Sequence, residues 1–174
     1  MTAIEIRDGQ VDDADDVASI HVRSWQAAYR GLIDQDLLDA LSIPDRAASW
    51  RHFVAEPLPT GLGILVAVRD GAILGWASFG SGRDDDSAAD GEVYGIYADP
   101  DAWSTGVGRA LLTAAEERIA EAGHPRAYLW VLDGNDRADA FYARQGWELD
   151  GATKVEERPG MRLQEHRRVK EIGN

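Results

Sequence analysis

The chain contains no cysteine among its 174 residues. Disulfide bonds, thiol nucleophiles and thiolate metal sites are therefore excluded. Long apolar runs are absent too, because no segment approaches the roughly 20 apolar residues of a membrane-spanning helix. The first ten residues carry acidic side chains and no apolar core. We therefore expect a cytoplasmic protein that has no signal peptide and no membrane partner.

Basic residues are scarce in this sequence. Lysine and arginine together number 18 against 31 aspartates and glutamates, which gives a net charge of −13. Nucleic-acid-binding proteins need a basic surface, so we expect no nucleic-acid partner. An acidic protein can attract a cationic amine substrate. The simpler interpretation is that the acids form a solvated surface that keeps the chain soluble.

Helical and strand patterns follow one another along the chain without repeats or a linker, and 44% of the residues are hydrophobic. The helical patterns predict helices at about 12–29, 34–41, 44–54, 106–122 and 135–145. Short apolar segments predict strands at 3–7, 63–69, 72–80, 92–98, 126–132, 147–155 and 161–169. Asp70-Gly71, between two of these strands, is a strong hairpin signal. We predict one α+β domain around a mixed sheet.

The most informative segment runs from Glu92 to Leu112. Its strand stops at Asp99-Pro100, and Gly106-Val107-Gly108 then leads into a helical pattern. Glycines let the backbone approach an anion closely, and the free N–H groups and dipole of a helix start favour phosphate. The segment is not a P-loop, since no Gly-Lys-Ser/Thr follows, and the third glycine of a dinucleotide fingerprint is Leu111 here. A plain helix-start loop is the alternative interpretation.

Two motifs carry a family resemblance. The glycine loop reads Trp103-Ser104-Thr105-Gly106-Val107-Gly108 after Tyr97-Ala98-Asp99-Pro100, and residues 135–147 read NDRADAFYARQGW. They resemble the Q/R-x-x-G-x-G/A loop and the N-x-x-A-x-x-F-Y-x-x-x-G-F segment of the GCN5-related N-acetyltransferase (GNAT) superfamily, with Trp147 in place of the usual phenylalanine. Residues 20–31 are similar to a bacterial subgroup whose substrates are mostly unassigned.

The resemblance implies the GNAT fold, a mixed and mostly antiparallel central sheet of about six or seven strands with helices on both faces. It implies a single acetyltransferase domain over residues 1–174, with acceptor-side helices at about 12–54 and an acetyl-CoA-binding core at about 63–157. The implied activity is direct attack of a primary amine on acetyl-CoA, without a metal. The lack of cysteine agrees with direct transfer because it removes the commonest covalent nucleophile.

The resemblance also implies how acetyl-CoA is held. Main-chain N–H groups of the glycine loop would cradle the pyrophosphate, and the pantetheine arm would pair with an open strand edge. The N–H of Ile96 or Tyr97 would polarise the acetyl carbonyl. The implied cofactor-binding residues are Ile96, Tyr97, Ala98, Ser104, Thr105, Gly106, Val107, Gly108, Arg109, Asn135 and Tyr142. Asn135 is in addition an excellent helix N-cap.

Two side chains are the implied catalytic residues. Tyr142 is the candidate acid, because a phenol with a pKa near 10 is protonated at neutral pH and can give a proton to the departing thiolate. The alternative is an aromatic residue that packs its helix onto the sheet. Glu92 is the candidate base, acting through water. The alternatives are an exposed acid at a strand end and loss of the amine proton to bulk water.

The acceptor side is less well defined. The resemblance implies that the first helices form the acceptor wall, with Trp25, Tyr29 and Trp50 as candidates for holding an amine by their aromatic faces. Core packing is the competing interpretation for Trp25, and packing or surface positions are favoured for His21 and His52. Residues 84–86, all aspartates, suggest a metal or polyamine site, against a solvated, mobile loop. A small-molecule or peptide amine is the expected acceptor, and a homodimer is compatible with the sequence.

A second hypothesis comes from the glycine loop itself. Trp103 stands where the family usually has glutamine or arginine, and Ser104 stands where it has glycine. These departures allow a CoA-binding sensor or interaction module that has lost catalysis. Tyr142 and Glu92 argue for an enzyme instead. The residues do not distinguish acetyl from a longer acyl group.

Overall fold

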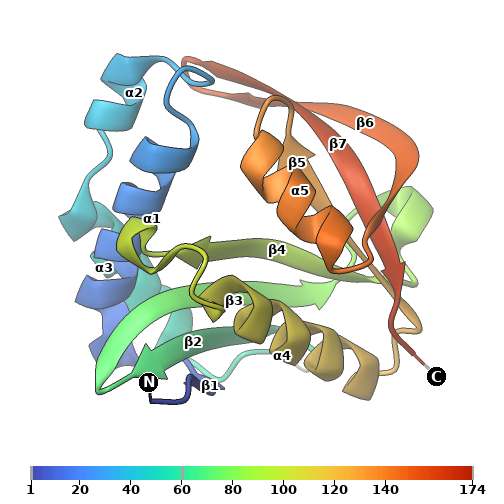
Figure 1. The fold of residues 1–174 in the computed structure, drawn as a ribbon, viewed down its shortest axis with the longest axis horizontal. Coiled ribbons are helices and arrows are strands. Elements are labelled where there is room, and N and C mark those ends of the chain that lie inside the picture. Colours follow the sequence, from blue (N-terminus) through green and yellow to red (C-terminus); the bar gives the residue numbers. More distant parts are fainter. Residues whose placement is uncertain (1, 60, 174) are drawn as a thin grey trace.

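The computed structural model describes residues 2–59 and 61–173. Seven strands form one sheet in the order β1-β2-β3-β4-β5-β7-β6 (Figure 1). The strands are β1 (Glu5–Asp8), β2 (Gly63–Arg69), β3 (Ala72–Ser81), β4 (Gly91–Ala98), β5 (Arg126–Leu132), β6 (Glu148–Arg158) and β7 (Met161–Glu171). The α-helices are α1 (Ala14–Ala28), α2 (Gln35–Asp39), α3 (Ile43–Val54), α4 (Val107–Glu121) and α5 (Asp136–Arg144). The expected mixed sheet is confirmed.

Helices cover both faces of the sheet, as expected. Strand residues alternate between the faces, so Leu65 and Ala67 pack with α4 whereas Ile64 and Val66 pack with α1 and α3. Helix α5 lies on the same side as α4 (Figure 1). The two clusters of buried side chains on opposite faces hold the sheet in place, and burying them supplies the main favourable free energy of folding.

The hairpin between β2 and β3 turns at Asp70-Gly71, as the sequence predicts. Both residues have left-handed backbone conformations, with φ of 52° and 81°. A two-residue turn of this kind matches the right-handed twist of the flanking strands. The hairpin therefore fixes the register of the central strands, with Arg69 opposite Ala72.

Strands β4 and β5 run parallel, and they are paired only at Gly91 with Ala127 and Glu92 with Tyr128. All other neighbouring strands are antiparallel. Beyond Glu92 the two strands diverge, and β5, β7 and β6 turn away from the first four strands (Figure 1). One edge of β4 is consequently left without a strand partner from Val93 onwards.

Some predicted boundaries differ from the structure. The first strand covers Glu5–Asp8 rather than residues 3–7, and the last two strands each extend to longer lengths than predicted. The final hairpin carries a register shift between Leu149 and Thr153, an irregularity of the kind that bends a strand. Within the described ranges, no helix is long and apolar enough to cross a membrane.

Candidate active site

A cavity of about 360 Å³ opens where β4 and β5 diverge. Its walls come from α1, β4, the start of α5 and the β6–β7 hairpin. Many of the residues singled out from the sequence line it, namely Trp25, Tyr29, Glu92, Ile96, Tyr97, Ala98, Asn135 and Tyr142. Of the glycine loop, Trp103 lines the cavity, whereas residues 104–108 do not.

Helix α4 begins without a side-chain cap. Its N-cap is Gly106, which has a φ of +92°, and Ser104 just before it also has a positive φ of 63°. In the part of the chain that the structure describes, the N–H groups of residues 106–109 have no hydrogen-bond acceptor. Free N–H groups at the positive end of a 15-residue helix fit an anionic group such as a phosphate.

The unpaired edge of β4 offers backbone groups to the cavity. Asp99 donates its N–H to the carbonyl of Leu74 in β3 at 2.9 Å. Alternate residues of an antiparallel strand bond to the same neighbour, so Tyr97 also faces β3, and Ile96 and Ala98 face the unpaired edge. The expectation that the N–H of either Ile96 or Tyr97 could serve the site is corrected: of these two residues, it is Ile96 that presents its N–H there.

Trp103 has a definite place beside this edge. Its indole Nε1 donates to the carbonyl of Ala98 at 3.0 Å, and the guanidinium carbon of Arg137 lies 3.4 Å from the centre of the Trp103 rings. Arg137 lines the cavity and, among the described residues, forms no ion pair. Burial lowers the pKa of Arg137 from its ordinary value of 12.5, but the group stays charged at neutral pH. Sequence reasoning missed this cation, although it lies two residues after Asn135.

Tyr142 lies on α5 and presents a hydroxyl group to the cavity. The ring is half-buried against Phe141 and Trp147, at centroid distances of 5.1 and 6.4 Å. No described residue forms a hydrogen bond with the hydroxyl group. Burial raises the pKa of Tyr142, so the phenol keeps its proton at neutral pH. Asn135 caps the same helix by accepting the N–H of Ala138 at 3.3 Å.

Glu92 is buried, with 1% of its surface exposed, so the interpretation as an exposed strand-end acid is wrong. Its Oε2 accepts hydrogen bonds from the Tyr128 hydroxyl at 3.0 Å and from the backbone N–H and Nε of Arg83 at 3.2 and 2.9 Å. Among the described residues, its Oε1 accepts only from Arg83, at 2.7 Å. Glu92 is therefore held as an ion pair, and one acceptor position remains at Oε1.

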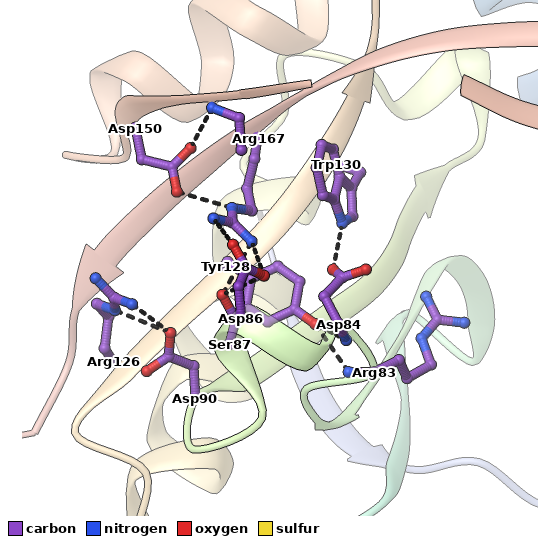
Figure 2. Close-up of polar contacts among 11 residues, drawn as sticks. Arg83, Asp84, Asp86, Ser87, Asp90, Arg126, Tyr128, Trp130, Asp150 and Arg167 are labelled. Atoms are coloured by element: carbon purple, nitrogen blue, oxygen red, sulfur yellow. Dashed lines mark hydrogen bonds and ion pairs between the residues drawn. The ribbon is translucent and has the colours of Figure 1, made fainter. Parts of the chain in front are cut away.

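Side-chain hydrogen bonds tie the segment between β3 and β4 to β5 and β7 (Figure 2), although Asp85 and Asp86 are exposed, as expected of a solvated loop. Arg167 of β7 donates to Asp86 at 2.9 and 2.8 Å, to Ser87 at 2.9 Å and to Asp150 at 2.7 Å. Asp84 accepts from the Trp130 indole at 2.8 Å. These bonds turn the aspartates toward different partners and fix the segment over β5 and β7 beside the cavity.

The aromatic residues of the first helices divide into those that line the cavity and those that do not. Trp25 and Tyr29 line the cavity and meet edge to face at 5.0 Å. His21 is stacked on Trp25 and Tyr97, and burial lowers its pKa to about 4, which makes it a neutral packing residue. Trp50 does not reach the cavity, so its assignment to the acceptor wall is wrong. It is buried between α3 and the sheet, where Nε1 donates to the carbonyl of Gln10 at 3.1 Å.

Comparison with known proteins gives a consistent result. A family model described as the acetyltransferase (GNAT) family matches residues 19–147. The uncharacterized N-acetyltransferase YuaI of Bacillus subtilis is 31% identical over 133 residues, which are 76% of this chain and 73% of that protein.

Solved structures share the same fold. A GCN5-related N-acetyltransferase from Rhodopseudomonas palustris has a TM-score of 0.77 at 21% identity, over 99% of this chain and 98% of that chain. The PaiA N-acetyltransferase from Thermoplasma acidophilum, in complex with coenzyme A, has a TM-score of 0.71 at 20% identity, over 97% and 99% of the two chains.

Proposed function

The chain belongs to the acetyltransferase (GNAT) family and is an acyltransferase, and on that premise we propose that it moves an acetyl group from acetyl-CoA to a primary amine by direct attack. The observation that carries the proposal is the divergence of β4 and β5 beside an uncapped helix start. An unpaired strand edge and a set of free N–H groups fit the amide-bearing arm and the phosphates of CoA. The similar Thermoplasma protein was solved with coenzyme A, which agrees with this choice.

In this proposal the N–H groups of residues 106–109 bind the pyrophosphate, and Arg137 adds a positive charge. Arg137 lies over the ring of Trp103, the residue that stands where the family usually has glutamine or arginine. In this proposal the guanidinium that faces the phosphates is therefore that of Arg137 on α5, and not one from the glycine loop. Ser104, Thr105 and the residues up to Arg109 shape the loop, and the backbone of Ile96 and Ala98, with Asn135, borders the pantetheine arm.

The chemistry needs an activated acyl group, which bound acetyl-CoA supplies as a thioester. The N–H of Ile96 at the unpaired edge stabilises the negative charge that develops on the acetyl oxygen. Tyr142 donates its proton to the departing sulfur, since the phenol stays protonated and its hydroxyl group has no described protein partner.

Glu92 acts, in this proposal, through a water molecule at the one acceptor position left on Oε1. The base removes the proton of the attacking amine. Because the carboxylate is already paired with Arg83, loss of the amine proton to bulk water remains the competing route. Residues 12–54, with Trp25 and Tyr29, form the acceptor side, and residues 63–157 form most of the acetyl-CoA-binding core.

Isothermal titration with acetyl-CoA, with free CoA and NAD as comparators, tests the proposal first. We expect micromolar binding of acetyl-CoA and CoA and no binding of NAD. A coupled assay for free thiol with a set of primary amines then tests turnover. Acetyl-CoA binding without turnover on any amine would favour the CoA-binding sensor. Absence of CoA binding would overturn both the acetyltransferase and the sensor hypotheses.

A further inference from the structure

One carboxylate in the cavity lacks a hydrogen-bond donor. Glu165 of β7 lines the cavity with a side chain that is 15% exposed, and its Oε2 is buried with no hydrogen-bond partner among the described residues. The nearest cation is the Nζ of Lys154, at 3.7 Å from Oε2, which is beyond hydrogen-bond distance. Leaving a buried charged oxygen unsatisfied is costly, so the position favours a donor from outside the chain.

Lys154 is held away from Glu165 by another contact. Its Nζ lies 4.4 Å from the centre of the Trp130 rings, and Trp130 is itself fixed by its bond to Asp84. A cation over an aromatic face is already stabilised there. Lys154 therefore screens the charge of Glu165 without satisfying its buried oxygen.

Each of the other three acids of the cavity has a hydrogen-bond donor, which for Asp84 is the Trp130 indole at 2.8 Å. Glu92 is paired with Arg83 at 2.7 Å, and Glu156 is paired with Arg158 at 2.8 Å. The cavity lining has four carboxylates and four cations. Once Arg137 is assigned to the phosphates of CoA, three cations face four carboxylates. The acceptor side thus has more carboxylates than cations. Glu165 is the carboxyl group that lacks a hydrogen-bond donor, and burial raises its pKa.

This arrangement complements an acceptor that carries a second positive charge. Its aromatic wall, Trp25 and Tyr29, is apolar enough to cover an alkyl chain. An ammonium group carries a positive charge and provides three hydrogen-bond donors, and a donor is what the buried oxygen of Glu165 lacks.

We propose that the acceptor is an alkyl diamine, one end of which is held as an ammonium by Glu165 while the other attacks the thioester. In the attack the lone pair of the neutral amine forms the C–N bond and the C–S bond breaks. The amine proton leaves to Glu92 through water or to solvent, and the sulfur receives the proton of Tyr142. The proposal rests on the function proposed above, since it names the substrate class of the same site.

The test compares butane-1,4-diamine with butylamine, which has the same reacting amine but no second charge. We expect the native chain to have a kcat/KM about tenfold or more higher for the diamine, as a charged hydrogen bond can provide. Glu165→Gln should remove that preference by raising the KM for the diamine about tenfold, so that the two amines then have similar kcat/KM values.

Glu157→Gln is the matched control. Glu157 lies on the same hairpin, has a side chain that is 72% exposed and does not line the cavity. The control variant should keep the full preference. Titration of butane-1,4-diamine, monitored by calorimetry, should show binding to the native chain and to Glu157→Gln, and binding weakened about tenfold in Glu165→Gln.

The outcomes separate the two proposals. Equal kcat/KM values for the two amines, or equal losses in both glutamine variants, would overturn the role of Glu165 and leave acetyl transfer intact. Absence of acetyl-CoA binding would overturn the proposed function, and the diamine proposal with it. If Glu165→Gln loses its cooperative thermal transition, binding of the two amines to the native chain still decides the question.

Discussion

The two sides of the cavity are built in different ways. The proposed cofactor side depends on main-chain groups of two neighbouring segments, the unpaired edge of β4 and the start of α4. The acceptor side depends on side chains from α1, the segment between β3 and β4, and the β6–β7 hairpin. Main-chain groups tolerate many side-chain replacements, as Trp103 and Ser104 illustrate. Because the acceptor side consists of side chains, we expect it to be the part that sets which acceptor is used.

The largest effect is expected where the two sides meet, at Tyr142. Tyr142→Phe should lower kcat about 100-fold, because general acid catalysis contributes on that scale. The dissociation constant of acetyl-CoA should not change. Since burial raises the pKa of Tyr142, the phenol is protonated throughout the neutral range. Deprotonation of Tyr142 should therefore not lower kcat of the native chain between pH 6 and about 9. An unchanged kcat in the variant would remove Tyr142 from the chemistry.

A second prediction separates the acceptor side from the cofactor side. Arg167→Leu removes the bonds that tie Asp86, Ser87 and Asp150 together, so the segment beside the cavity should loosen. We expect the midpoint of thermal unfolding to fall by about 5 °C and the acceptor KM to rise. Acetyl-CoA affinity, measured by calorimetry, should stay within about twofold. Arg162→Leu, at a side chain that is 73% exposed, is the control and should shift the midpoint little.

A third prediction tests whether a cation from α5 serves the cofactor side. Arg137→Ala should weaken CoA binding about tenfold, because it removes a charged donor from the phosphates. Binding of pantetheine, which lacks the pyrophosphate, should be unaffected, and the salt dependence of CoA binding should decrease. Arg144→Ala, an exposed position on the same helix, is the control. Equal losses in both variants would point to general charge effects.

The smallest effect is expected from the backbone at the start of α4. Gly106 and Gly123 flank the same helix with φ of +92° and +95°, and neither has an atom closer than 3.8 Å to an added Cβ. Alanine at either position should lower the free energy of unfolding by about 1 kcal/mol, because L residues are strained there. Only Gly106→Ala should also weaken acetyl-CoA binding, about fivefold. Calorimetry on both variants checks this difference, and equal binding in the two would argue against the N–H groups as the phosphate site.

Much of the fold follows from local sequence signals. Asp70-Gly71 predicts a turn that the structure contains, and 126–132 is a strand with the predicted bounds. Such signals are readable because turn chemistry and apolar periodicity act over a few residues. Both strands of the final hairpin continue beyond the predicted ends, because exposed strand residues show little apolar pattern.

The candidate site likewise combines features that follow from local sequence with features that depend on the tertiary structure. The sequence by itself determined the glycine loop, the N-cap Asn135 and the position of Tyr142, because each belongs to a short motif whose spacing fixes its local geometry. Only the tertiary structure decided that Arg137 lies over Trp103, that Arg83 pairs with Glu92, and that Glu165 reaches the cavity without a donor. The contact of Arg137 with Trp103 and the place of Glu165 in the cavity depend on elements far apart along the chain, whereas Arg83 and Glu92 are nine residues apart. Sheet order and the divergence of β4 and β5 create these contacts, and no local pattern records which distant side chains will meet.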